Sequence, residues 1–133
     1  MEYPRAIICR KLYEHFGNDN RRIEHALHVL HHADNIMPQY QNCDPDIVVA
    51  AALLHDVGIK PSEAELGYNN GITQEQYGPP IARRLLLEIG FPSDKIEKVA
   101  EIIGNHHSPS RFDYPELEIL KKADLIVNRD EKV

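Results

Sequence analysis

The most apolar stretch of this chain, Ile47–Leu54, ends directly in His55 and Asp56. Asp44 followed by Pro45 is a typical helix start, and the run after it has too few polar positions for a surface helix. We therefore expect a central, buried helix with two titratable side chains at its C-terminal end. Polar groups without partners are costly in such a place. A bound cation would compensate both of them, so this stretch predicts an internal metal site.

The rest of the chain is a series of helical patterns separated by marked stops. It shows no sustained alternation of polar and apolar residues of the kind that a half-buried strand needs. The pattern predicts an all-α protein. The expected helices run from Pro4 to a stop at Gly17, from a cap at Asp19 or Asn20 to before Pro38, from a cap at Ser93 to His106 and His107, and from Leu117 to Val127.

Residues 61–80 have a weaker pattern than their surroundings. Residues 67–71 are rich in glycine and asparagine, so we expect a surface loop there that could cover a pocket. Thr73 with Gln76 has the spacing of a capping box. The Gly-Pro-Pro sequence at 78–80 is expected to kink or restart the helix that follows.

Composition narrows the classes of protein that this chain can be. Its 133 residues suit a single domain, which we expect to span residues 1–133 with a core of about 19–128. A net charge of −6 argues against general binding to nucleic acid or anionic membranes. The two cysteines, Cys9 and Cys43, suggest neither a disulfide framework nor a thiolate zinc site. No apolar run is long enough to cross a bilayer, and we expect a cytoplasmic protein.

The candidate metal ligands are two imidazoles and two carboxylates, supplied by well-separated segments: His25, His55, Asp56 and Asp124. A mixed nitrogen and oxygen set suits Fe, Mn, Ni, Co or Zn, with Mg as a further candidate. Four protein ligands leave positions open on an octahedral ion, so a water could bind there, lose a proton more readily and attack an electrophile. If His106 or His107 also coordinates, Asp56 could bridge two ions. The donor set alone permits one ion or two.

The order His25, then His55 with Asp56, then Asp124 resembles the metal-binding signature of the HD superfamily of metal-dependent phosphohydrolases. The similarity extends to the flanking residues from about 19 to 128, in the order that the family requires. The resemblance implies a compact helical bundle that holds the metal between its central helices. It also implies hydrolysis of a phosphate ester, commonly in a nucleotide. The segments that carry it are 22–29 (RIEHALHV), 51–60 (AALLHDVGIK), 78–83 (GPPIAR) and 123–128 (ADLIVN).

One departure from the family pattern bears on the number of ions. Members with two metals usually carry a further histidine between the His-Asp pair and the paired histidines, and residues 73–78 contain none. Glu75 could replace it chemically, and His106 with His107 resembles the paired histidines. The resemblance therefore favours one ion, leaves two open, and makes His106 a further candidate ligand.

Asp56 and Lys60 are the candidate catalytic residues, with Asp56 binding the ion and orienting the water. The candidate phosphate contacts are cations and one imidazole: Arg22, Lys60, Arg83 and His107. A guanidinium can hold a phosphate through two parallel hydrogen bonds, but it can equally pair with a carboxylate between helices. Glu63 could serve as a general acid or base or be an ordinary solvated carboxylate.

The sequence leaves two other functions open. One is a nonenzymatic module that binds a nucleotide or a protein around a structural metal, and the other is an oxygenase with two iron ions. All four candidate ligands are present in order, which favours the enzyme over the module. The missing middle histidine argues against the oxygenase. The expected partner is a small phosphorylated molecule, and a homodimer is compatible with the sequence.

Overall fold

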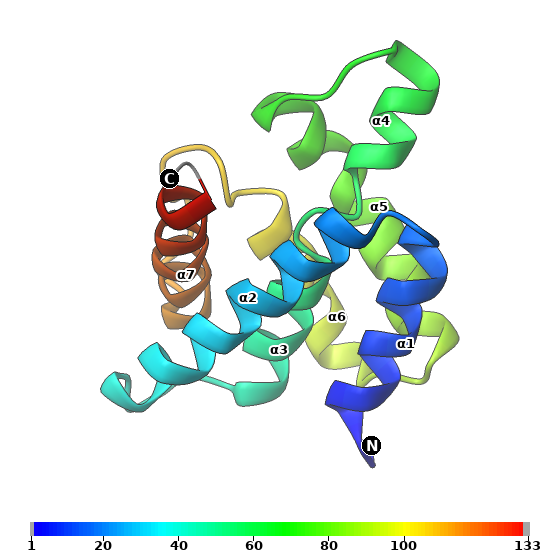
Figure 1. Cartoon of the computed structure of the whole chain (residues 1–133). Coiled ribbons are helices and arrows are strands. Elements are labelled where there is room, and N and C mark those ends of the chain that lie inside the picture. Colours follow the sequence, from blue (N-terminus) through cyan, green and yellow to red (C-terminus); the bar gives the residue numbers. More distant parts are fainter. Residues whose placement is uncertain (1, 132–133) are drawn as a thin grey trace.

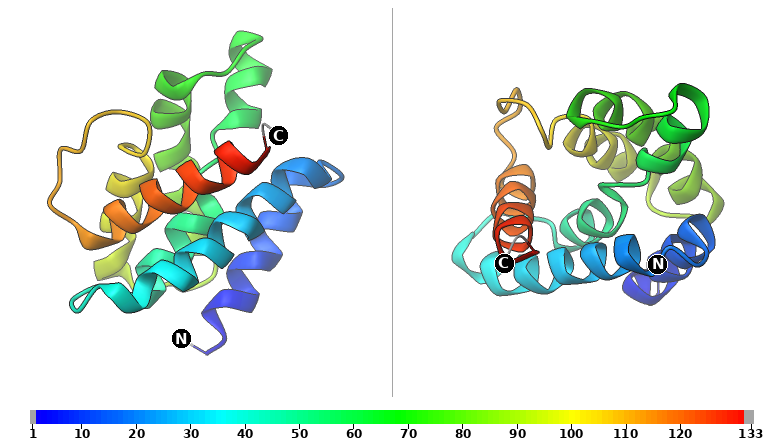
Figure 2. Two further views of the ribbon diagram at one scale, coloured as in Figure 1. Left: turned by 60° about the vertical axis from the view of Figure 1, so that its left-hand side comes forward. Right: turned by 45° about the horizontal axis from the view of Figure 1, so that its top comes forward.

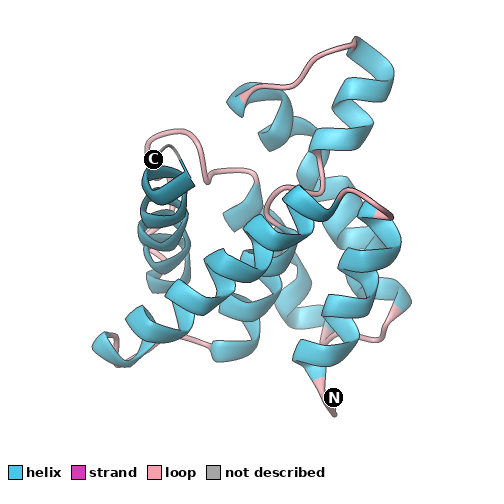
Figure 3. Ribbon diagram, viewed as in Figure 1, coloured by secondary structure: helices cyan, strands magenta, loops and turns pink. Residues whose placement is uncertain are grey.

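Helix α3 (Pro45–Leu54) lies at the centre of the molecule, where it packs against four other helices. The computed structural model describes residues 2–131, and within them the chain forms seven α-helices, one short 3₁₀-helix and no strand (Figures 1 and 3). The predicted all-α bundle is confirmed. The remaining elements are α1 (Pro4–Phe16), α2 (Asn20–Ile36), η1 (Met37–Gln39), α4 (Ile59–Leu66), α5 (Gly71–Glu88), α6 (Ser93–Ile103) and α7 (Pro115–Glu131).

Every side chain from Ile47 to Leu54 is buried, as the apolar run predicts. The Asp44 carboxylate begins α3 by accepting hydrogen bonds from the backbone N–H groups of Asp46 and Ile47. Helices α1, α2, α6 and α7 surround α3 (Figure 2). Each fully buried Leu, Ile or Val side chain contributes about 1.5–3 kcal/mol, so this packing fixes the position at which α3 ends.

The structure confirms the predicted N-cap of one helix and corrects that of another. Asp19 is the N-cap of α2, and its carboxylate accepts from the backbone N–H of Arg22. The expected cap at Ser93 is wrong, because Ser93 is the first residue of α6 and Pro92 occupies the cap position without a side-chain hydrogen bond. A serine placed one residue inside a helix cannot reach the N–H groups that a cap residue satisfies.

Residues 61–80 contain more helix than their sequence pattern indicates. Helix α4 covers Ile59–Leu66 and buries few of its side chains, so its sequence carries little apolar periodicity. The true capping box pairs Asn70 with Thr73, three residues before the expected pair. Only residues 67–70 remain as a loop between α4 and α5.

The sequence predicts a kink or a restart at Gly78-Pro79-Pro80, and helix α5 continues through both prolines without a restart. The two prolines remove two backbone donors but do not end the helix. Gly58 permits a close approach, since a Cβ there would lie 2.5 Å from the backbone nitrogen of Gly78. The turn that follows Asp56 therefore packs directly on α5. Within residues 2–131, no helix combines the length and apolar character that a membrane span requires.

Candidate metal centre

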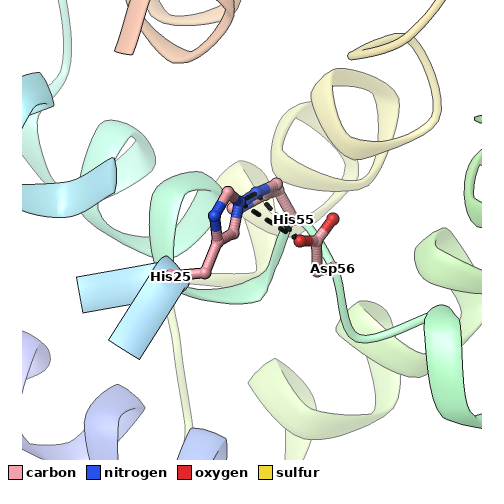
Figure 4. Close-up of side chains that lie close together, drawn as sticks. All are labelled: His25, His55 and Asp56. Carbon is pink, nitrogen blue, oxygen red and sulfur yellow. Dashed lines mark hydrogen bonds and ion pairs between the residues drawn. The ribbon is translucent and has the colours of Figure 1, made fainter. Parts of the chain in front are cut away.

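Three separate helices bring the four predicted ligands together. Figure 4 shows His25, which comes from α2, beside His55 and Asp56, which follow the end of α3. Asp124 comes from α7. The Nε2 atom of His25 lies 3.2 Å from Nε2 of His55, 3.1 Å from Asp124 Oδ1 and 3.4 Å from Asp56 Oδ2. His55 Nε2 lies 3.3 Å from Asp56 Oδ2 and 3.5 Å from Asp124 Oδ1. We call these four residues the floor cluster.

The backbone and one carboxylate orient the histidines toward a common point. The Nδ1–H of His55 donates to the Ala52 carbonyl at 2.7 Å, and that of His106 donates to the Ile103 carbonyl at 2.5 Å. The Nδ1–H of His25 donates to Glu131 Oε2 at 2.9 Å. Each ring therefore turns its Nε2 toward the carboxylates of Asp56 or Asp124, where that atom can bind a metal ion once it carries no proton. Metal-binding histidines characteristically donate their other N–H to a carbonyl or carboxylate in this way.

The charges of the floor cluster favour positive charge at its centre. Burial alone would lower the pKa of His55, but the charge of Asp56 and a hydrogen bond to Asp124 outweigh it and raise that pKa to about 9. Burial alone would raise the pKa of Asp56, but the neighbouring imidazoles, His55 first, hold it at about 2. The same imidazoles keep the pKa of Asp124 far below its ordinary value despite burial. A proton or a metal cation can provide the positive charge.

His106 adds a second set of donors beside the floor cluster. Its Nε2 is buried, has no hydrogen-bond partner and lies 3.7 Å from Asp56 Oδ1. Asp56, His106 and His107 can each place one ligand atom within 4.8 Å of the others, as can His25, His55 and Asp56. Asp56 thus belongs to both groups, with one oxygen toward each. A buried imidazole nitrogen without a hydrogen-bond partner fits the role of a metal ligand.

A cleft of about 260 Å³ opens above these ligands. Two cations, Arg21 and Arg22, and two amides, Gln74 and Asn128, line it together with members of the floor cluster. These groups can receive a negatively charged substrate although the chain carries a net charge of −6.

The comparison with protein families agrees with this geometry. The family model of the HD domain matches residues 22–129, which include every member of the floor cluster. The chain belongs to the HD-domain family.

Two further proteins are similar to this chain, and one of them is a predicted HD superfamily hydrolase. A crystal structure of a predicted HD superfamily hydrolase from an uncultured Thermotogales bacterium superposes with a TM-score of 0.69 and 27% identity, over 94% of this chain and 72% of that one. An uncharacterized protein of Acanthamoeba polyphaga mimivirus is 32% identical over 115 residues, which is 81% of this chain. This chain spans about half the length of that curated relative, 49%.

The predicted phosphate contacts divide into two groups. Arg22 and His107 both line the cleft of this HD domain. Lys60 does not, because its ammonium group donates to the Phe16 carbonyl at 3.1 Å, at the end of α1. Arg83 lies outside the cleft as well and pairs with Glu97 at 2.8 Å. The structure therefore does not bring Lys60 and Arg83 to the ligands.

Glu75 also points away from the metal ligands. Its Oε2 accepts hydrogen bonds from the backbone N–H groups of His107 and Ser108 and from the Ser108 hydroxyl. It shapes the loop between α6 and α7 and is not available to replace a missing histidine.

Sequence reasoning missed four polar residues of the cleft: Arg21, Gln74, Asn128 and Glu131. Asn128 and Glu131 follow Asp124 by four and seven residues, so all three share one face of α7. That spacing is a signal that could have found two of them. Gln74 offers no such signal, since its place depends on how α5 packs.

Proposed function

We propose that this HD domain is a metal-dependent phosphohydrolase that acts on a small phosphorylated molecule, with a nucleotide as the favoured class. The observation that carries this proposal is the convergence of two imidazole Nε2 atoms and two carboxylates at the bottom of a cleft whose rim holds arginines. The family match supports the hydrolytic class.

The floor cluster would hold the resident ion through His25, His55, Asp56 and Asp124. Its nitrogen and oxygen donors suit Mn, Fe, Co, Ni or Zn, with Mg as a further candidate. Such an ion supplies Lewis-acid charge and lowers the pKa of water. The unpartnered Nε2 of His106 supports a second ion as the alternative, which Asp56, His106 and His107 would hold.

The chain's own residues would perform the remaining tasks. Asp56, which is ionised at neutral pH, can accept a hydrogen bond from the attacking water and so orient it. Arg22 and His107 lie on the rim of the same cleft and would contact the bound substrate. The positive charge and N–H donors of Arg22 neutralise negative charge that builds on the phosphoryl oxygens. Burial lowers the pKa of His107, so this side chain would contact the substrate as a neutral imidazole. Lys60 and Arg83 have no part in this proposal.

The test is phosphate release by the full chain, purified without chelator and with its metal content measured by elemental analysis. Nucleoside mono-, di- and triphosphates and sugar phosphates are offered with Mn²⁺, Fe²⁺, Co²⁺, Ni²⁺ or Mg²⁺ in turn. We expect turnover that chelation abolishes and metal restores. Nucleotide binding without metal-dependent turnover would contradict the proposal in favour of a binding module. Oxygen consumption coupled to substrate oxidation would contradict it in favour of an oxygenase.

A further inference from the structure

A continuous chain of hydrogen-bonded side chains runs around the cleft from α4 to the loop after α6. We call Glu63, Asn69, Gln74 and His107 the rim chain. Asn69 Nδ2 donates to Glu63 Oε2 at 2.8 Å, and Gln74 Nε2 donates to Asn69 Oδ1 at 2.9 Å. The Oε1 atom of Gln74 then meets Nε2 of His107. On its other side, Glu63 accepts two hydrogen bonds from Arg22, at 2.9 and 3.1 Å.

The chemistry of Glu63 fixes the direction of every bond in the rim chain. Its pKa is lowered by the hydrogen bond from Arg22, so the group is an ionised carboxylate and can only accept. Asn69 must therefore turn its NH₂ group toward Glu63 and its carbonyl toward Gln74. Gln74 must turn its NH₂ group toward Asn69, which leaves its carbonyl toward His107. A carbonyl only accepts, so the facing nitrogen of His107, Nε2, must carry the proton.

His107 is thereby set in the opposite tautomer to the other histidines of the site. His25, His55 and His106 each donate through Nδ1 to a group outside the donor set and turn Nε2 toward the carboxylates of Asp56 or Asp124. His107 donates through Nε2, so its only lone pair is on Nδ1. Only that atom can accept a hydrogen bond or coordinate an ion from the cleft.

We propose that Glu63 is the positioning residue for two side chains that line the cleft, Arg22 and His107. It holds the guanidinium of Arg22 directly, and through Asn69 and Gln74 it selects the Nε2-protonated tautomer of His107, which presents an acceptor, Nδ1, to the cleft. The assignment of Arg22 and His107 as substrate contacts rests on the proposed function. The tautomer of His107 does not, because it follows from hydrogen bonds within this chain.

The tautomer can be measured directly. The full chain is labelled with ¹⁵N-histidine, freed of metal by chelation because a bound ion would itself select a tautomer, and studied at about pH 8.5, where a histidine of ordinary pKa is neutral. Long-range ¹H–¹⁵N spectra separate the two tautomers, and a His107→Gln variant assigns the signals. Far-UV circular dichroism checks that each sample keeps its helices. We expect His107 to carry its proton on Nε2.

Glu63→Gln tests the direction of the rim chain. The introduced amide has one acceptor oxygen in place of two and can turn its NH₂ group toward Asn69, so the direction of each later bond is no longer fixed. We expect His107 to lose its single tautomer and to gain the Nδ1-protonated form. Gln74→Glu, which keeps an acceptor beside His107, should retain the wild-type pattern. Glu65→Gln, an exposed change on the same helix, is the matched control. An Nδ1 proton in the wild type, or an unchanged His107 in Glu63→Gln, would overturn the proposal.

Kinetics test the second half of the proposal separately. With a phosphate ester that the protein hydrolyses, Glu63→Gln should raise KM about tenfold or more and change kcat less, because it misplaces two substrate contacts and leaves the metal ligands intact. The same KM as in Glu65→Gln would overturn the positioning role. If the protein hydrolyses no phosphate ester, the proposed function fails, while the tautomer measurement still decides whether Glu63 orders the rim chain.

Discussion

The floor cluster and the rim chain lie on either side of one cleft but are held in place differently. The floor residues come from α2, α7 and the end of α3, which pack on one another within the apolar core. The rim residues Glu63, Asn69 and Gln74 lie on α4, on the short loop after it and at the start of α5. Helix α4 packs mainly against α5, and Tyr68 and Ile72 nearby are exposed.

The side chains of this one site are therefore held in place in two different ways. Core packing determines where the floor ligands stand, and each histidine there needs only one further hydrogen bond to fix its ring. Hydrogen bonds between polar side chains determine where the rim residues stand, so they depend on one another. We therefore expect changes in the floor to act on metal retention and changes in the rim to act on substrate binding.

Asp56→Ala should have the largest effect, because Asp56 belongs to both donor groups and its loss leaves several imidazoles facing each other without a carboxylate. We expect metal content to fall to background and phosphate release to fall by at least about 100-fold. Elemental analysis and the phosphate assay measure the two effects. Asp130→Asn, an exposed change on α7, is the control. Metal content equal to that of the control would remove Asp56 from the ligand set.

Glu131→Gln should weaken metal binding by the floor cluster without removing a ligand. The carboxylate accepts the Nδ1–H of His25 at 2.9 Å and so helps to hold Nε2 toward the cluster. Outer partners of this kind are typically worth about 10–100-fold in metal affinity. Competition with a metal-binding dye measures the change, again against Asp130→Asn. Equal affinities in the two variants would show that the core alone orients His25.

In the metal-free protein, the pH dependence of the free energy of unfolding should also come from the floor cluster. The pKa of His55 is about 9 in the folded protein against an ordinary 6.5, so its stabilising charge is present below pH 6.5 and is lost as the pH rises through 9. The pKa of Asp56 is about 2 against 3.8, so its contribution is lost only as the pH falls through 2. Between pH 6.5 and 9, the free energy of unfolding should therefore decrease as the pH rises.

Thermal unfolding with and without metal measures this effect. Metal binding requires neutral imidazoles and so strengthens as protons leave. The Tm of the metal-free protein should fall across this pH range, while the metal-loaded protein should not show the same fall. A constant Tm in the metal-free protein would mean that His55 is not protonated there.

Gly58→Ala tests the contact between the turn after Asp56, which belongs to the floor cluster, and helix α5, which carries Gln74 of the rim chain. An added Cβ would lie 2.5 Å from the backbone nitrogen of Gly78 and 3.0 Å from the carbonyl oxygen of Gln74, and neither is a flexible side chain. We expect a loss of about 1–3 kcal/mol in the free energy of unfolding. The comparison variant is Gly78→Ala, whose Cβ would meet a side-chain methyl group of Ile103 at 2.8 Å. Urea unfolding should show the larger loss for Gly58→Ala, and the reverse order would contradict this packing.

The floor was the more predictable half of the site. Its helices carry clear caps and apolar faces, and the apolar run before His55 could only be buried. The rim could not be predicted, because α4 is too exposed to show a period and Gln74 is an ordinary amide until α5 is packed. The sequence pattern favours Thr73 as the cap of α5, whereas Asn70 is the cap and Thr73 is the third residue of that helix. The tautomer of His107 depends on three other side chains that no local pattern connects.

Lys60→Met should have the smallest effect of these changes, although the position of Lys60 just after Asp56 predicts a phosphate contact. The C-terminal carbonyl groups of a helix lack intrahelical partners and attract cations. The ammonium group of Lys60 accordingly meets the Phe16 carbonyl at the end of α1. We expect KM for a phosphate ester to change less than about twofold, as for a typical surface charge. Arg83→Met, which breaks an exposed pair with Glu97, should behave in the same way. A tenfold rise in KM for Lys60→Met alone would mean that substrate draws this side chain away from α1 and that the rim extends onto the start of α4.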